Sequence, residues 1–314
     1  MRKVVLEATW IGRKASVRVR QPVINVIGIF TNTIDLVTTQ GFIAVTTKNI
    51  KSPIYINLDP YTFFLKVRNF REWLSINQSR KIHVKNNTLH LGPYLSLILK
   101  KAKLFDPSPE LNKLRNNCYG VDSKKLITVK KKFIALSKVA GKTINDYYFN
   151  LFSEGALRLY QLLSSNRKDS HMDALLRYLG LGNGLTPTYD DFIGGLVSTT
   201  NIIHELGQYI PKKVSFPLNT LLSRTTKVSA YLLTSLSEGD ISDIHLNIIR
   251  SYCLGDVDAL LNYLMDFISL GHDSGLSMGI GILTGLYLAS MYKEIQGTEE
   301  SVVRSLRMLL TDLN

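Results

Sequence analysis

The clearest fold signal in this 314-residue chain is the segment VINVIGIFTNTIDLVTTQGFIAVTTKNIKSPIYINL, residues 23–58. It consists of short runs rich in Val, Ile and Thr, and Thr-Asn, Gln-Gly and Ser-Pro pairs interrupt these runs at close, regular spacing. Such runs are typical of β-strands, and the interrupting residues are typical of turns. Several short strands in succession predict a small barrel or sandwich.

The sequence on either side of this segment extends the β region. ASVRVR (15–20) predicts a further strand, and KIHVKNNTLHLG (81–92) predicts a hairpin around Asn86-Asn87. His83 and His90 alternate with apolar residues on the hairpin and could hold a metal as a pair, but no third ligand is apparent. We therefore interpret them as surface histidines of a β-rich domain over residues 1–104.

The pattern changes after residues 105–125, FDPSPELNKLRNNCYGVDSKK, which contain two prolines and many polar residues. This composition predicts a linker, and the lysine-rich KKLITVKKKF (124–133) has the same character. Beyond it, apolar residues recur at a spacing of three to four, which predicts helices. The expected fold class is α+β, with a small N-terminal β-barrel or sandwich followed by a mainly α-helical domain over 126–314.

The charge of the chain is uneven. The whole chain carries a formal net charge of +13, with +18 in residues 1–150 and −5 in residues 151–314. A basic half is compatible with nucleic-acid binding, but the basic residues are scattered and accompany no RNA-binding, zinc-finger or helix-turn-helix pattern. We expect a solvated lysine-rich surface or a face that docks an acidic partner subunit, and no nucleic acid.

Three features bear on location. Cys118 and Cys253 fit neither a disulfide framework nor a metal cluster, so we expect a reducing cytoplasm. The N-terminus has no uninterrupted apolar segment of the secretory type. Residues 275–292 carry no charge and approach membrane-spanning length, but they contain four glycines and several hydroxyls, and no second such span exists. We therefore expect a buried helix and no membrane partner.

The most distinctive loop is GLGNGLTPTYDD, residues 180–191, which precedes the apolar run FIGGLVSTTNII. Its glycines allow positive φ and close approach of a ligand, and Asp190 is a suitable N-cap for a helix that begins at residue 191 or 192. The N–H groups at a helix start can hold a phosphate or carboxylate, although two adjacent aspartates would repel an anion unless they bind a cation or a donor group. The plainer alternative is a capping loop, because one glycine pattern alone is a weak signal.

A second segment of the same plan is GHDSGLSMGIGILTGL, residues 271–286. Aligning the two segments pairs Thr188 with Ser274, Asp191 with Ser277, and Gly195 with Gly281. Two similar helix starts predict one site framed by both, with the 180–191 loop beside residues 271–277. His272 lies in the second loop and is a candidate for proton transfer or hydrogen bonding.

No nucleophile-elbow, phosphate-loop, zinc-protease or dinucleotide-binding motif accompanies these loops. The sequence therefore predicts no cofactor and no metal site.

The two loops resemble the AllH-like family, whose usual signatures are G-x-G-x-GLTPSGDDFL-x-G and G-H-x-SG-x-D-x-L-x-G. The segment from Asn25 to Leu58 is also similar to that family's β region. Two departures stand out. Thr188-Tyr189 replaces the usual Ser-Gly, so that the tyrosine ring is expected to narrow the loop, and Ser277 replaces the usual Asp.

The resemblance implies a subunit of oxamate carbamoyltransferase, working with two other subunits in anaerobic allantoin and purine breakdown. The expected ligands are oxamate-like anions, phosphate or carbamoyl phosphate. On this basis His272 and Asp191 are the candidate catalytic residues. The candidate ligand-binding residues are Gly182, Asn183, Gly184, Thr186, Asp190, Ser274 and Gly275.

Two rival hypotheses stay open. In the first, the chain is a non-catalytic scaffold or anion-binding subunit whose glycine motifs serve packing and whose chemistry lies in a partner chain. In the second, weaker one, it is a stand-alone metal-assisted hydrolase that uses the aspartates and His272.

Overall fold

The structure, a computed structural model, describes residues 3–21, 24–67, 82–92, 95–165, 168–269, 273–294 and 305–306. By its internal contacts the chain divides into two compact units. Unit 1 comprises Met1–Pro107 with Asp240–Asp243, and unit 2 comprises Ser108–Gly239 with Ile244–Asn314.

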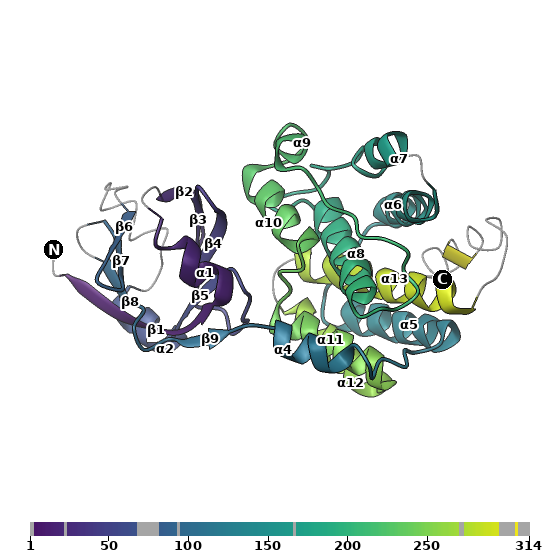
Figure 1. Cartoon of the computed structure of the whole chain (residues 1–314), viewed down its shortest axis with the longest axis horizontal. Helices are drawn as coiled ribbons and strands as arrows, with labels where there is room; N and C mark the ends of the chain where they lie inside the picture. Colours follow the sequence, from purple (N-terminus) through teal and green to yellow (C-terminus); the bar gives the residue numbers. More distant parts are fainter. Residues whose placement is uncertain are drawn as a thin grey trace. The chain divides into compact units, whose positions relative to one another are not determined.

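Unit 1 is built on one mixed sheet that is nearly closed into a barrel (Figure 1). The strands follow the order β2-β3-β4-β5-β1-β8-β7-β6, and β9 also pairs with β1. Their bounds are β1 (Val4–Gly12), β2 (Ile24–Ile29), β3 (Thr33–Thr38), β4 (Gly41–Thr46), β5 (Tyr55–Leu58), β6 (Ile82–Lys85), β7 (Thr88–Leu91), β8 (Leu95–Ile98) and β9 (Lys103–Phe105). The β-rich N-terminal fold expected from the sequence is confirmed.

Aliphatic side chains from these strands fill the interior of unit 1. Ile34, Leu36, Val45 and Ile56 are fully buried in one hydrophobic cluster. The β6–β7 hairpin turns at Asn86 and Asn87, whose φ angles of 50° and 55° suit a tight two-residue turn. The hairpin prediction is therefore confirmed.

The predicted strand at 15–20 is wrong, because the chain forms helix α1 (Arg13–Arg18) there. A side chain at Gly12 would lie 2.2 Å from the Ser52 carbonyl oxygen, so glycine lets β1 end in this close contact. The next turn buries Ala15 and Arg18, and Arg18 Nη1 donates to the Phe42 carbonyl at 2.9 Å. The alternation of Val and Arg thus reflects a short helix with one buried arginine. A second helix, α2 (Pro60–Lys66), follows β5.

Unit 2 is helical throughout its described part. Its helices are α4 (Ser108–Leu114), α5 (Ser123–Val139), α6 (Asp146–Ser164), α7 (Lys168–Leu175), α8 (Thr188–Glu205), α9 (Leu218–Leu222), α10 (Lys227–Ser237), α11 (Asp243–Leu254), α12 (Val257–Ile268) and α13 (Ser274–Glu294).

Part of the stretch expected to be a linker is helical. α4 lies within residues 105–125, and residues 124–133 belong to α5. Asp122 caps α5 by accepting the Lys125 N–H at 2.9 Å, and Leu126, Val129 and Phe133 face the core. The lysines between these apolar positions occupy other faces of an amphipathic helix.

The centre of unit 2 is the pair α8 and α13 (Figure 1). A Cβ at Gly195 would lie 2.3 Å from the Met278 carbonyl oxygen, and one at Gly281 would lie 2.1 Å from the Phe192 carbonyl oxygen. Glycine therefore allows the two backbones to touch. α13 is long and apolar enough to cross a membrane, but 89% of its apolar window is buried inside this unit. The uncharged stretch from 275 to 292 is thus a core helix of unit 2.

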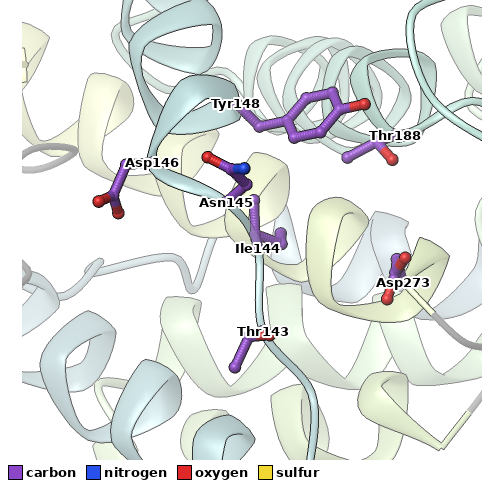
Figure 2. A pocket seen from close by; sticks show the side chains of 7 residues that line it. All are labelled: Thr143, Ile144, Asn145, Asp146, Tyr148, Thr188 and Asp273. Carbon is purple, nitrogen blue, oxygen red and sulfur yellow. The ribbon is translucent and has the colours of Figure 1, made fainter.

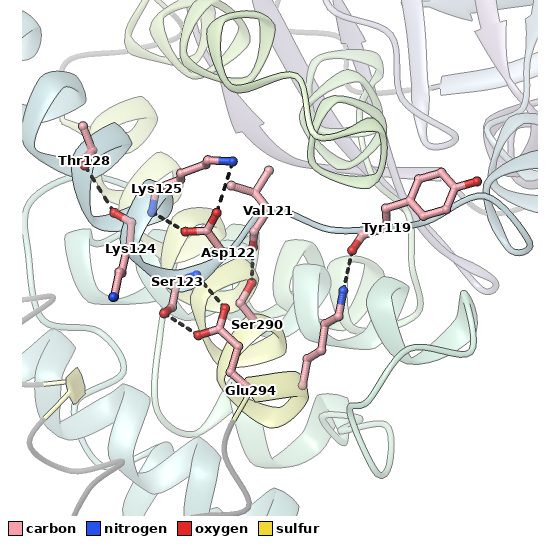
Figure 3. A network of polar contacts seen from close by, with 10 residues as sticks. Tyr119, Val121, Asp122, Ser123, Lys124, Lys125, Thr128, Ser290 and Glu294 are labelled. Carbon is pink, nitrogen blue, oxygen red and sulfur yellow. Dashed lines mark hydrogen bonds and ion pairs between the residues drawn. The ribbon is translucent and has the colours of Figure 1, made fainter.

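The interpretation of the cysteines as unpaired is wrong, because Cys118 and Cys253 form a disulfide. The bond ties the segment before α5 to the end of α11, and the Tyr119 N–H also donates to the Cys253 carbonyl at 2.8 Å. Figure 3 shows the continuation of this anchoring onto α13, where Ser290 Oγ donates to the Val121 carbonyl at 2.6 Å and Glu294 accepts from Ser123. A spacing of 135 residues gave no sequence signal for this pairing.

Candidate functional site

The loop before α8 is held tightly by its own glycines and by a neighbouring segment. Gly180, Gly182 and Gly184 all have positive φ, at 85°, 129° and 92°. A Cβ at Gly182 would lie 2.3 Å from the Thr188 nitrogen, so the loop folds directly onto the first turn of α8. By contrast, a Cβ at Gly184 would meet no atom within 4 Å. A side chain at position 182 would therefore clash with the start of α8, whereas one at position 184 would meet open space.

Asp190 fixes this loop, but not as the expected N-cap. α8 begins at Thr188, its N-cap is Pro187, and Asp190 lies inside the first turn. Asp190 Oδ1 accepts the Gly180 N–H at 2.8 Å, and Oδ2 accepts the hydroxyls of Thr225 and Ser229. The residue is 1% exposed, and burial raises its pKa while these three hydrogen bonds oppose the rise. Both oxygens of its carboxyl group therefore accept hydrogen bonds from the protein.

The two glycine motifs meet at a hydrogen bond between Thr186 and Ser274, whose hydroxyl oxygens are 3.1 Å apart. This contact joins the loop before α8 to the first residue of α13, so the predicted proximity of the two segments is confirmed for these residues. His272, the other residue named in that prediction, lies outside the described residues.

Asp191 lies beside this junction and is 3% exposed. Burial raises its pKa well above the usual 3.8, and the charge of Asp190 adds to the rise, whereas hydrogen bonds with Ser274 and Thr186 oppose it. Its Oδ2 atom is buried without a hydrogen-bond partner among the residues that the structure describes. Asp191 therefore favours the neutral carboxylic acid, a form that can donate as well as accept a hydrogen bond.

Tyr189 does not narrow the loop, contrary to expectation. Its ring is fully buried, and its hydroxyl donates to the Leu175 carbonyl at 3.1 Å. A Cβ at Gly155 of α6 would lie 2.7 Å from that hydroxyl, so the phenol extends toward α6. The replacement of the family's usual glycine by tyrosine thus adds a contact in the core, and the ring does not occupy the space beside the loop.

The remaining predicted residues have different surroundings. Asn183 is exposed at the loop tip. A Cβ at Gly275 would lie 1.8 Å from the Phe267 carbonyl oxygen. The close packing of α13 against α12 is therefore sufficient to explain the glycine at this position. Ser277 is buried, and its hydroxyl donates to the Asp273 carbonyl at 3.1 Å.

A pocket of about 450 Å³ opens next to these helix starts (Figure 2). One wall is the connector between α5 and α6, which also contributes Ile144, and the other wall is formed by the starts of α8 and α13. The polar and aromatic lining residues are Thr143, Asn145, Asp146, Tyr148, Thr188 and Asp273.

The sequence analysis missed the residues of the α5–α6 connector. Gly141 with φ 73° ends the turn after α5, and Asn145 caps α6 by accepting the Tyr147 N–H at 2.9 Å. The Gly-Lys-Thr-Ile-Asn stretch before an apolar helical pattern was therefore a recognisable helix-start signal.

Metal chemistry receives no support from the residues whose placement is described. Among them, no group of three or more His, Cys, Asp or Glu side chains is arranged to hold a metal ion. His83 and His90 face each other across β6 and β7 with ring centroids 4.8 Å apart, which gives two nitrogen ligands at most.

Comparison with known protein families finds a match over part of the chain. The model of the family described as "Oxamate carbamoyltransferase subunit AllH" matches residues 178–286, about a third of the chain. The matched segment contains both glycine motifs and the whole of α8, and it confirms the resemblance there. No curated protein and no solved structure matches.

Proposed function

We propose that this chain is a subunit of a multi-subunit carbamoyltransferase that acts on oxamate or a related small anion, in purine or allantoin catabolism. The family description names such a subunit, and the match covers the segment that contains Asp190, Asp191 and Ser274. The observation that carries the proposal is the Thr186–Ser274 hydrogen bond, because it joins both motifs at the starts of α8 and α13. Separate motifs that converge on one point suit a shared ligand site better than two independent turns.

In the proposed reaction a carbamoyl group passes between phosphate and the amide nitrogen of oxamate. In the direction that forms carbamoyl phosphate, a phosphate oxygen attacks the carbamoyl carbon, the carbon–nitrogen bond breaks, and the departing nitrogen takes up a proton. Such chemistry needs two positioned reactants, stabilisation of the oxygen that becomes negative, and a proton donor. His272 is our candidate donor.

In this proposal Asp191 does not contact the ligand but positions the two hydroxyls that do. Because it is 3% exposed, its carboxyl group does not reach a ligand, and its hydrogen bonds with Thr186 and Ser274 orient those two hydroxyls. Gly182, Asn183 and Gly184 form the adjoining loop edge, where the open space at Gly184 leaves room for a ligand. Asp190 keeps that loop in place through its three accepted hydrogen bonds.

The partners proposed for this chain are the other subunits of the transferase. The net charge of +18 in residues 1–150 favours an acidic protein partner by complementary charge, and it also raises the local concentration of anions. We also propose that the protein is located in the cytoplasm.

The experiment that tests the proposal is reconstitution with the subunits encoded beside this gene. Ser274→Ala and Thr186→Val remove the two hydroxyls at the junction, and each should lower the carbamoyl-transfer rate by about tenfold or more, the effect of one lost transition-state hydrogen bond. Ser153→Ala is the matched control, because that half-buried hydroxyl donates to the Phe149 carbonyl of its own helix and, among the described residues, to no group of the two motifs. Melting temperatures of all three variants show whether the fold is retained.

The alternative is a non-catalytic scaffold, and one observation favours it. Asp190 and Asp191 are both buried, while Gly195 and Gly281 make backbone contacts, so much of the two motifs serves packing. Unchanged transfer rates in both Ser274→Ala and Thr186→Val would support the scaffold and refute a ligand site at the junction.

A further inference from the structure

Helix α2 of unit 1 exposes three large apolar side chains, Tyr61, Phe64 and Leu65, which we call the α2 patch. Their side chains are 72%, 64% and 62% exposed. The spacing of three and four residues places them on one face of the helix, whereas Phe63 and Val67 belong to the buried hydrophobic cluster of unit 1. Among the helices that the structure describes, no other exposes three large apolar side chains.

The contacts that fix α2 come from other residues. Asp59 caps the helix by accepting the Thr62 N–H at 2.7 Å, and Phe63 anchors it in the core with 2% of its surface exposed. Single exposed apolar residues are common on protein surfaces, but a contiguous group of them marks an interaction site. Aromatic side chains are also enriched at the centres of protein interfaces. The α2 patch therefore has the composition of a docking surface.

Basic side chains border the α2 patch. Lys66 follows it on the same helix, and Lys66 Nζ donates to the Val5 carbonyl of β1 at 3.1 Å. Val5 and Glu7 lie on the outward face of β1, because the residues between and after them are buried. Glu7 has the Lys101 ammonium 3.7 Å from its carboxylate, so its negative charge is offset there. The border of the patch is basic among the described residues.

This charge decides between kinds of protein partner. Residues 1–107 contain 17 Lys and Arg against 5 Asp and Glu. In a two-fold dimer the same surface of both copies meets, so Lys66 and Lys101 would face their own counterparts. Like charges in contact disfavour such a pair, whereas an acidic surface attracts this one. The charge therefore favours a different, acidic protein over a second copy of this chain.

We propose that the α2 patch docks an acidic subunit of the transferase complex, with Tyr61 and Phe64 buried at the centre of the interface and Lys66 and Lys101 facing carboxylates at its rim. The inference rests on the proposed function for the identity of the partner. Buried aromatic side chains supply most of the affinity of such an interface, and rim charges speed association. Unit 1 then holds the partner, and unit 2 contains the ligand site.

The first test measures binding of the isolated full chain to each subunit encoded beside this gene, by titration calorimetry. One subunit should bind, and Tyr61→Ala and Phe64→Ala should each weaken this binding by about tenfold or more. Tyr209→Ala is the matched control, because Tyr209 is 55% exposed and belongs to unit 2. Alanine forms helices better than either aromatic residue, so both α2 variants should keep their fold, as melting temperatures will show.

The second test concerns the rim charges. Lys101→Gln should slow association with the bound subunit and reduce its dependence on salt. Lys113→Gln is the matched control. The two lysines are 77% and 74% exposed, and each pairs with a glutamate, but Lys113 lies on α4 of unit 2. Carbodiimide, which joins amines to carboxylates in contact, should couple Lys66 or Lys101 to an acidic residue of the bound subunit.

Four outcomes would overturn the inference. Two of them concern the subunits: none binds, or one binds as tightly to Tyr61→Ala and Phe64→Ala as to the wild type. The third is self-association of the chain that Phe64→Ala abolishes in sedimentation, which would assign the patch to a second copy. The fourth is binding to vesicles of phosphatidylserine and phosphatidylcholine that Phe64→Ala abolishes, which would assign it to a lipid surface.

The proposed function is judged separately, by the transfer rate of the reconstituted complex. An active complex whose assembly is indifferent to Tyr61→Ala and Phe64→Ala refutes the docking surface and leaves the function. Binding of a subunit that depends on both aromatic residues, in a complex without transfer activity, supports the docking surface and refutes the function.

Discussion

Thr186 and Ser274 are 88 residues apart in the chain, and their hydroxyl oxygens are 3.1 Å apart in the structure. Asp191 lies beside them as a buried carboxyl group whose Oδ2 has no partner among the described residues. An uncompensated buried polar atom destabilises a fold, so this carboxyl group is a candidate for a role other than stability. The site is therefore best tested by changes that separate stability from transfer rate.

Asp191→Asn should stabilise the fold at high pH. Because burial raises the pKa of Asp191 well above 3.8, the folded protein binds more protons than the unfolded chain between those two pKa values. The free energy of unfolding therefore falls as pH rises through that interval, and asparagine abolishes this fall. Melting temperatures at pH 4.5 and pH 8 should show the variant gaining on the wild type as pH rises.

The same variant should lower the carbamoyl-transfer rate of the complex, because asparagine cannot act as a carboxylic acid toward Thr186 and Ser274. Asp266→Asn, at an exposed position on α12, is the control for both measurements. A variant that is less stable at pH 8 than at pH 4.5, relative to wild type, would contradict the burial argument.

Asp190→Ala should destabilise unit 2 strongly. It removes the acceptor for the Gly180 N–H and for the hydroxyls of Thr225 and Ser229. Leaving buried donors unsatisfied costs about 1–3 kcal/mol each, and the two hydroxyls can rotate to other acceptors, so we expect a net loss of about 2–4 kcal/mol. Denaturant unfolding measures this loss. Ser229→Ala should cost only about 1 kcal/mol, since it removes one hydrogen bond of the same group. Equal losses in the two variants would argue against the central role of Asp190.

The general fold followed from periodicity. Alternating β-branched runs between residues 23 and 58 became β2 to β5, and the apolar spacing after residue 132 became helices. The strand predicted at 15–20 failed because tertiary contacts determine its conformation: Gly12 lies against Ser52, and the Arg18 side chain reaches the Phe42 carbonyl. In a segment of about six residues, the alternation of apolar and polar side chains is too short a signal to predict the conformation against such tertiary contacts.

The proximity of the two helix starts could be predicted because both segments share one sequence pattern. Contacts that depend on how separate helices pack could not be predicted. The similarity of the two glycine segments predicted that the 180–191 loop lies beside residues 271–277, and the Thr186–Ser274 hydrogen bond confirms this proximity for those two residues. The helix begins at Thr188 and not at residue 191 or 192, and the Asp190 side chain accepts three hydrogen bonds from other parts of unit 2 where an N-cap had been expected. Neither that network nor the contribution of Tyr148 to the pocket is visible in the local sequence, since both depend on how separate helices pack.

Gly155 and Tyr189 form a testable packing pair. A Cβ at Gly155 would lie 2.7 Å from the Tyr189 hydroxyl, so Gly155→Ala alone should be destabilising despite its gain of about 1 kcal/mol in helix propensity. Tyr189→Phe alone should cost about 1 kcal/mol for the lost hydrogen bond to the Leu175 carbonyl. In the double variant the missing hydroxyl makes room for the alanine, so its loss of stability should be smaller than the sum of the two single losses. Additive losses in the double-mutant cycle would contradict the contact.

The Cys118–Cys253 disulfide should contribute substantially to the stability of unit 2. It closes a segment of 135 residues, for which chain entropy predicts about 3–5 kcal/mol. Cys118→Ala and Cys253→Ala should each lower the free energy of unfolding by that amount, and reductant should lower the wild type equally while leaving both variants unchanged. Alkylation of thiols at the moment of cell lysis, read by mass spectrometry, then shows whether the bond exists in the cell. Disulfides are rare in a reducing cytoplasm, so a fully oxidised pair would argue against the proposed cytoplasmic location. Two free thiols together with an unchanged melting temperature under reductant would instead show that the bond is not part of the native fold.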